Sequence, residues 1–360
     1  TGKSSRNGKY LPILQAMIAA LLFGASAPLS KVLLGQVEPI PLAGLLYIGS
    51  GLGALLGFLA QSGSRRKVRR EAALSLQDVP WLIGAILAGG IIAPIFSMIG
   101  LNTTPASTAS LLLNFETVAT ALIAGLFFRE AINKRTIIAV MIITAASIFL
   151  SWSSQGWGFS AGALLVAAAC VFWGLDNNFT RNISAKDPLL IVTFKGLIAG
   201  IFSLLLSLYL GKPMPAIQII LAALLLGAIC YGLSIYLVIL AMRHLGSTRT
   251  YALFATAPFA GTLLSFLLLR DQPLWNFWPG VILMVIGTWV MVSEHHEHLH
   301  LHESIVHTHN HPHPDVHHEH EHIPGEELGA GTHSHTHRHA NFEHTHPHTP
   351  DLHHRHAHSP

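Results

Sequence analysis

Long apolar segments recur along most of this chain and constrain its fold more than any other feature. A helix needs about 20 apolar residues to cross the hydrocarbon core of a bilayer, which is about 30 Å thick. The chain has 360 residues, of which 51% are hydrophobic and 11% are charged, whereas a soluble domain has about 25% charged residues. We therefore expect an all-α integral membrane protein. Ten transmembrane helices are predicted, at residues 11–34, 41–60, 80–100, 106–128, 135–152, 159–180, 188–210, 216–241, 247–269 and 275–293.

The distribution of Lys and Arg predicts the orientation of these spans. With the N-terminus inside, most Lys and Arg residues fall on the inner side, including the basic cluster at residues 65–70. Lys31, Lys212 and Arg270 fall on the outer side. Because cytoplasmic connections carry the excess of Lys and Arg, we expect a multi-pass protein of the inner (plasma) membrane with cytoplasmic N- and C-termini.

Short motifs recur in the same order in two halves of the chain. An odd number of spans in each half gives the halves opposite orientation, and inverted repeats place a central site at their interface. The sequence therefore predicts a cytoplasmic N-terminus at 1–10, five-helix repeats at 11–152 and 153–293, and a tail at 294–360. The matching motifs are Phe23-Gly24 with Trp173-Gly174, Ser30-Lys31 with Thr180-Arg181, and Arg129-Glu130 with Arg270-Asp271.

Three ionisable residues fall within predicted spans, namely Glu116, Asp176 and Lys195. Charges at this depth are costly and usually face a partner or a watery cavity. Pairing Lys195 with Glu116 or Asp176 would lower the desolvation cost of both groups. The candidate substrate or coupling residues are these three with the neighbouring Asn114 and Asn177. Two structural readings stay open: a static ion pair between helices, and an Asp176 hydrated at the cytoplasmic rim.

The second span carries two further signals. Gly49, Gly53 and Gly57 are four residues apart and share one helix face, a spacing that lets helices pack closely. We expect the partner helix to belong to the same chain, with a homodimer as the alternative. Tyr47 lies near a span end and is predicted to be an interfacial anchor.

Taken together, these motifs resemble the EamA-type family of the drug/metabolite transporter superfamily. The family resemblance rests on the aromatic-Gly pairs near the first helix of each repeat and on Glu130 and Asp271 at the ends of the fourth helices. Thr117 stands where the second repeat has Pro258, which departs from the family pattern. The resemblance implies ten helices in two inverted repeats and secondary transport. The stretch from Leu111 to Glu130, with Asn114 and Glu116, looks like a branch of the family that has a His-rich C-terminal tail.

The tail at residues 294–360 holds every one of the 25 histidines except His244. It has too little apolar content to fold alone, so we expect it to be disordered. Imidazoles two residues apart lie on one side of an extended chain and can share a Zn or Ni ion. The predicted metal ligands are His296, His298, His300, His302, His307, His309, His311, His313, His318, His320, His322, His333, His335 and His337.

The combined features favour a secondary transporter that exports a small organic metabolite or drug by alternating access. Two alternatives are a divalent metal (Zn, Ni or Co) transporter and a metal- or pH-responsive membrane receptor. An enzyme is not expected, because the two HExxH matches lie in a His- and Glu-rich tail and not on a packed helix. The expected partners are a small-molecule substrate, the lipid bilayer and divalent metal ions, with no nucleic acid and no required cofactor.

Overall fold

The computed structural model describes most of the chain up to residue 292 and four short segments of the tail. Side chains are described except at residues 4–9, 61–63 and 242–244 and in the tail. The described residues are 4–63, 74–128, 134–152, 159–183, 186–245, 250, 253–273, 275–292, 297–302, 306–311, 333–338 and 342–347.

The part before residue 293 is helical throughout its regular structure, as predicted. Among the described residues, eight helical stretches are long and apolar enough to cross a membrane. Two shorter apolar helices, α13 and α14, fall in the ninth and tenth predicted spans. The helices are α1 (Ser4–Leu34), α2 (Pro39–Gly63), α3 (Val79–Ala85), α4 (Ala93–Thr103), α5 (Ala106–Leu112), α6 (Phe115–Phe127), α7 (Lys134–Ser151), α8 (Ala161–Asn182), α9 (Pro188–Tyr209), α10 (Ile217–Leu226), α11 (Ser234–Leu245), α13 (Ala257–Leu269) and α14 (Phe277–Val292).

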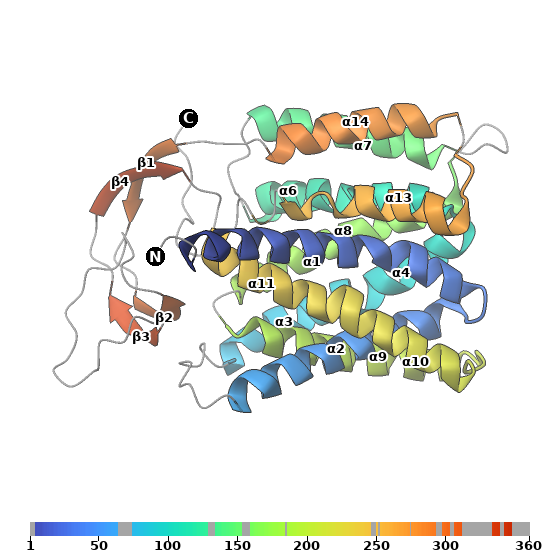
Figure 1. Cartoon of the computed structure of the whole chain (residues 1–360), viewed down its shortest axis with the longest axis horizontal. Coiled ribbons are helices and arrows are strands. Elements are labelled where there is room, and N and C mark those ends of the chain that lie inside the picture. The colour runs from blue at the N-terminus through green and yellow to red at the C-terminus, as the bar shows by residue number, and fades with distance from the viewer. Residues whose placement is uncertain are drawn as a thin grey trace.

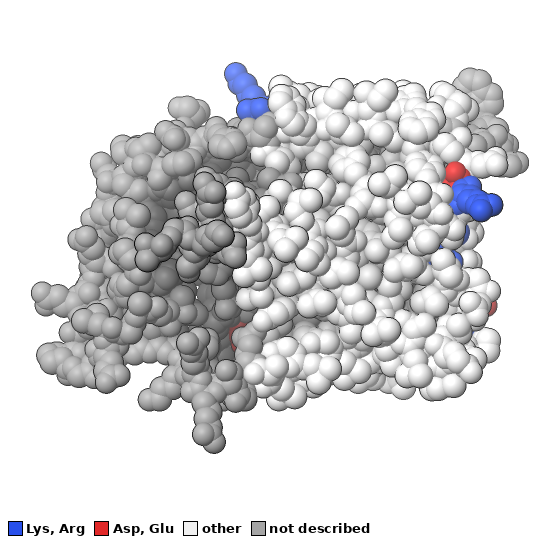
Figure 2. All heavy atoms as spheres, viewed as in Figure 1, with Lys and Arg blue, Asp and Glu red and all other residues white. Residues whose placement is uncertain are grey.

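Helices from the two halves of the chain pack against one another. The main pairs are α2 with α9, α7 with α14, α4 with α8, and α1 with α13 and α11. They run side by side along the long axis of the helical body, the name used here for helices α1 to α14 (Figure 1). Leu42, Leu111 and Met284 are fully buried between them. The visible outer surface of this body is almost free of Lys, Arg, Asp and Glu along its middle (Figure 2), which suits contact with lipid.

The third helix of each half contains a π-helical segment. The segment η2 (Ile86–Ile92) joins α3 to α4, after the 3-10 turn η1 (Leu76–Asp78), and η3 (Gly227–Leu233) joins α10 to α11. The two segments stand at the same sequence offset as Glu130 and Asp271. Such segments are rare and are frequently found at functional sites. In each case the segment packs on the first two helices of the other half, η2 on α8 and α9, and η3 on α1 and α2.

The fourth helix of the first half is broken, whereas the sequence predicts one continuous span at 106–128. The chain turns at Leu113 and Asn114 between α5 and α6. A turn at Ala255 and Thr256 precedes α13 at the matching place in the second half. Broken helices are tolerated at membrane depth where they are buried in protein or line a cavity.

The glycines of α2 pack within the chain, as predicted. A Cβ atom added at Gly49 would overlap the backbone of Leu224. One added at Gly53 would come within 3.1 Å of Ala228. Gly57 has more space around it, since a Cβ atom added there would lie 3.9 Å from its nearest neighbour, Leu189. Two of the three glycines therefore let α2 approach α10 and η3.

The expectation of a fully disordered tail needs correction at four segments. Strand β1 (Glu297–His302) pairs antiparallel with β4 (Phe342–Pro347), and β2 (Val306–His311) pairs with β3 (His333–Arg338). Alternating His with Thr, Leu or Val has the period of a strand. The predicted ligands His296, His313, His318, His320 and His322 lie outside the described residues.

Candidate functional site

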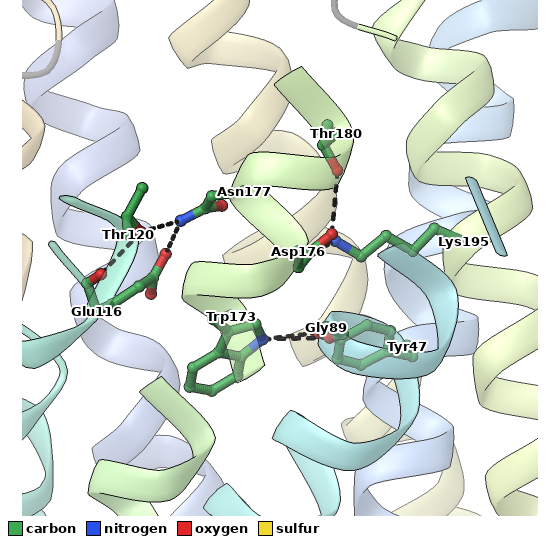
Figure 3. Close-up of polar contacts among 9 residues, drawn as sticks. All are labelled: Tyr47, Gly89, Glu116, Thr120, Trp173, Asp176, Asn177, Thr180 and Lys195. Atoms are coloured by element: carbon green, nitrogen blue, oxygen red, sulfur yellow. Dashed lines mark hydrogen bonds and ion pairs between the residues drawn. The ribbon is translucent and has the colours of Figure 1, made fainter. Parts of the chain in front are cut away.

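Glu116 lies in the first turn of α6, directly after the break in the fourth helix. Its Oε1 accepts a hydrogen bond of 2.8 Å from Nδ2 of Asn177 on α8 (Figure 3). The same amide donates to Oγ1 of Thr120 at 3.1 Å, and that hydroxyl donates to the backbone oxygen of Glu116 at 2.8 Å. A carboxylate in the first turn of a helix is stabilised by the free N–H groups there. Two of the candidate residues, Glu116 and Asn177, are therefore brought together, one from each half.

Asp176 and Lys195 form an ion pair between α8 and α9 (Figure 3). The second carboxylate oxygen of Asp176 accepts a 3.0 Å bond from Oγ1 of Thr180. Asp176 is only 4% exposed, so the alternative of a hydrated rim residue is wrong. Of the two partners proposed for Lys195, Asp176 is the one in contact. The Lys195 charge is thereby compensated within the second half.

Asn114 does not join this cluster. It is buried at the break, and its Nδ2 donates to the backbone oxygen of Leu111 at 3.3 Å. Its backbone oxygen accepts a 2.7 Å bond from the hydroxyl of Thr117. Both oxygens also accept backbone N–H bonds, from Asn114 and Thr117 respectively, so these side-chain contacts reinforce the turn at the break.

Tyr47, Gly89 and Trp173 form a second polar group beside Asp176 that the sequence does not predict (Figure 3). The hydroxyl of Tyr47 donates to the backbone oxygen of Gly89 at 2.6 Å, and Nε1 of Trp173 donates to the same oxygen at 3.2 Å. A Cβ atom at Gly89 would overlap the carboxylate of Asp176. The interpretation of Tyr47 as an interfacial anchor is wrong, because its ring lies half-buried between helices. The glycine pair at residues 89–90, within an apolar run, is the one sequence signal that could have pointed here.

A small, mainly apolar pocket adjoins these groups. It lies between α1 on one side and α4, α5 and α8 on the other, and it includes one aromatic ring from η3. Trp173 lines it and links it to Gly89. Leu113 also lines it and accepts the backbone N–H of Glu116 at 3.1 Å. The lining includes Phe23, Met98, Leu101, Val166, Trp173 and Tyr231.

This arrangement can bind a polar group of a small solute or exchange a proton. Asn177 is exposed and Glu116 is half-buried, so the Glu116 side of the cluster is not sealed by protein. Among the described contacts, Glu116 has an amide partner and no basic one, which leaves its charge available to a cation or proton. Among the described side chains, no three His, Cys, Asp or Glu residues gather to hold a metal ion. The histidine side chains of the tail lie outside that set, so metal binding by the tail stays a prediction.

Comparison with known proteins gives related transporters. An uncharacterized transporter of Methanothermobacter thermautotrophicus is 28% identical over 303 residues, covering 78% of this chain and 85% of that protein. The uncharacterized transporter YvbV of Bacillus subtilis is 25% identical over 200 residues, covering 55% of this chain and 63% of that protein. A solved structure described as "Crystal structure of protein" matches with a TM-score of 0.55 over 77% of this chain and 95% of that one. Its 21% identity shows a shared fold alone.

The sequence model of the EamA-like transporter family matches the chain twice, at residues 11–152 and 160–293. These two matches together span most of the chain and leave out the tail. They agree with the motif resemblance seen in the sequence and with the packing of one half on the other. The multi-pass helical chain therefore belongs to the EamA-like transporter family and is a membrane transporter.

Proposed function

We propose that this protein is a secondary transporter that exports a small organic solute by alternating access. The observation that carries the proposal is Glu116, a carboxylate in a broken helix that the other half holds through Asn177. Such a group between two halves can change its exposure as the halves move, while a purely structural residue would need no access to solvent. The adjoining apolar pocket suits the body of an organic molecule better than a bare metal ion.

The polar residues take different roles in this proposal. Glu116 binds a cationic group of the solute or the coupling proton, and Asn177 orients its carboxylate. Asp176 and Lys195 form a neutralised pair that fixes α8 against α9 and shapes the wall beside Gly89. Asn114 maintains the break that places Glu116 at the start of α6.

We also propose that α13 and α14 complete a set of ten membrane helices in two inverted five-helix repeats. The double match to one family, the two π-helical segments and the two matching turns support this duplication. Lys and Arg placement supports an inner-membrane protein with both termini cytoplasmic. The tail at 294–360 then faces the cytosol, where we propose that it binds Zn²⁺ or Ni²⁺ and regulates transport.

Reconstitution of the full chain into sealed liposomes tests this function. Uptake of amino acids, nucleosides, sugars, organic cations and divalent metals is compared with that of protein-free liposomes. Accumulation of at least one organic solute supports the proposal. Movement of Zn²⁺, Ni²⁺ or Co²⁺ alone would instead favour the metal transporter, and no movement of any solute would favour a receptor.

A further inference from the structure

The turn between α4 and α5 is held by two charged residues that the site described above does not use. We propose that Lys31 and Asp271 form a latch that closes the pocket on the membrane face where α1 ends. We call residues 101–107, which they hold, the outer turn. The inference rests on the proposed alternating-access cycle and names the residues that control one of its two openings.

Lys31 binds the outer turn through its backbone oxygens. Its Nζ lies 2.6 Å from the oxygen of Leu101, 2.9 Å from that of Asn102 and 3.0 Å from that of Thr104. The last turn of a helix leaves carbonyl groups unpaired at the negative end of its dipole. The ammonium group of Lys31 thus donates to three backbone oxygens, and its positive charge interacts favourably with the negative end of the α4 dipole. The sequence gives no sign of this contact, since Lys31 and the outer turn are far apart in the chain.

Asp271 holds the other end of the same turn. Its Oδ2 accepts 2.8 Å bonds from both the backbone N–H and the hydroxyl of Ser107. Thr262 of α13 adds a 3.2 Å bond to the backbone oxygen of Ser107. The residue before Asp271, Arg270, has φ of 52°, a left-handed conformation that costs a non-glycine residue free energy. The chain thus adopts a costly turn at the point that directs Asp271 to Ser107.

The Lys31 contacts join α1 to the end of α4, whereas Asp271 reinforces the packing of α13 on α5. The α1 helix packs chiefly on α13 and α11, whereas α4 packs chiefly on α8. The pocket lies between α1 and the α4 and α8 pair. Leu101, whose oxygen Lys31 binds, lines the pocket, and so does Ala109, two residues beyond Ser107. Separating Lys31 from the outer turn would therefore open the pocket at this end, while Glu116 lies on its other side.

The repeat places the same charge types at the opposite face. Arg181 stands at the position of Lys31, and Glu130 at that of Asp271. Glu130 lies outside the described residues. The order of the motifs alone thus gives each half one basic and one acidic residue at these places. A transporter that opens alternately needs a releasable closure at each membrane face.

Accessibility of a single cysteine measures the latch without knowledge of the substrate. In the full chain, Cys170→Ala and Cys230→Ala remove the two buried native thiols. Ser97→Cys then places a nearly isosteric reporter in the pocket lining. A membrane-impermeant maleimide is added from the Lys31 face, and the labelling rate is compared with and without Lys31→Met. Loss of a latch worth about 1.4 kcal/mol would raise the open population, and the rate, about tenfold.

The matched control is Lys212→Met, which removes another lysine whose described ion pair, with Glu38 at 3.5 Å, is exposed. Faster labelling in both Lys31→Met and Asp271→Asn, but not in Lys212→Met, supports the latch. If Lys31→Met fails to insert, the latch is tested with Asp271→Asn and Lys31→Arg. Fast labelling is then expected for Asp271→Asn, and slow labelling for Lys31→Arg, which retains the charge. Equal rates in all variants, or an equal rise in Lys212→Met, would overturn the proposal. If Glu116→Gln transports normally while Lys31→Met is labelled fast, the proposed role of Glu116 is overturned and the latch is not.

Discussion

At the scale of single residues, the buried charges of this protein are compensated in different ways. Asp176 has Lys195 and Thr180 as partners, while Glu116 has the neutral amide of Asn177. A group with a full counter-charge suits a fixed structural role. A group with an amide partner can lose or gain charge at lower cost, because no opposite charge is left uncompensated. We therefore expect the partners of a charged residue, and not its depth alone, to distinguish structural residues from transport residues.

Lys195→Met tests the structural half of this distinction. It leaves the Asp176 carboxylate buried without its counter-charge, and breaking a buried pair in this way costs about 3–5 kcal/mol. We expect a clear loss of thermal stability of the detergent-purified protein. Lys195→Met combined with Asp176→Asn should recover most of it, because the charge left behind is removed. A double variant as unstable as the single one would show that packing of the lysine chain, and not charge pairing, is what matters.

At the scale of helices, close packing depends on a few glycines. We predict that Gly49→Ala lowers the unfolding temperature in detergent, because its Cβ would overlap the Leu224 backbone and overpacking costs about 1–3 kcal/mol. Gly57→Ala is the matched control, since its Cβ would meet Leu189 at 3.9 Å, an ordinary contact. An equal effect of the two changes would contradict this account of how α2 packs.

The sequence predicts the helices well and their irregularities poorly. Spans follow from hydropathy and length, which are properties of a segment alone. The break after α5 and the π-helical segment η2 have backbone oxygens with partners on other helices. Cys170 donates to the oxygen of Leu112 at 3.4 Å, and Tyr47 and Trp173 donate to that of Gly89. Glu116, Asp176 and Lys195 could be chosen from the cost of charge in lipid. Which of these residues form a pair could not be predicted, because the sequence does not show which helix faces point toward each other.

At the scale of the whole molecule, we propose that the helices and the tail at residues 294–360 have separable roles. We predict that removal of residues 294–360 leaves insertion and solute transport intact and abolishes binding of Zn²⁺ or Ni²⁺ by the purified protein, measured by calorimetry at neutral pH. Free imidazole has a pKa of about 6.5, so metal binding by the full chain should weaken as the pH falls below that value. A truncated protein that inserts but moves no solute under any metal condition would place the tail in the transport path.

The central claim is that the chain moves a small organic solute through a site built on Glu116. The most direct test is uptake of the transported solute into sealed liposomes containing equal amounts of wild-type protein or Glu116→Gln. The amide keeps the size of the side chain and removes its charge and its ionisable proton. We predict that the variant inserts and unfolds like the wild type but loses most of the uptake, by about 100-fold if Glu116 makes one charge-assisted bond of about 3 kcal/mol in the transport cycle. Uptake by Glu116→Gln at the wild-type rate would contradict the account.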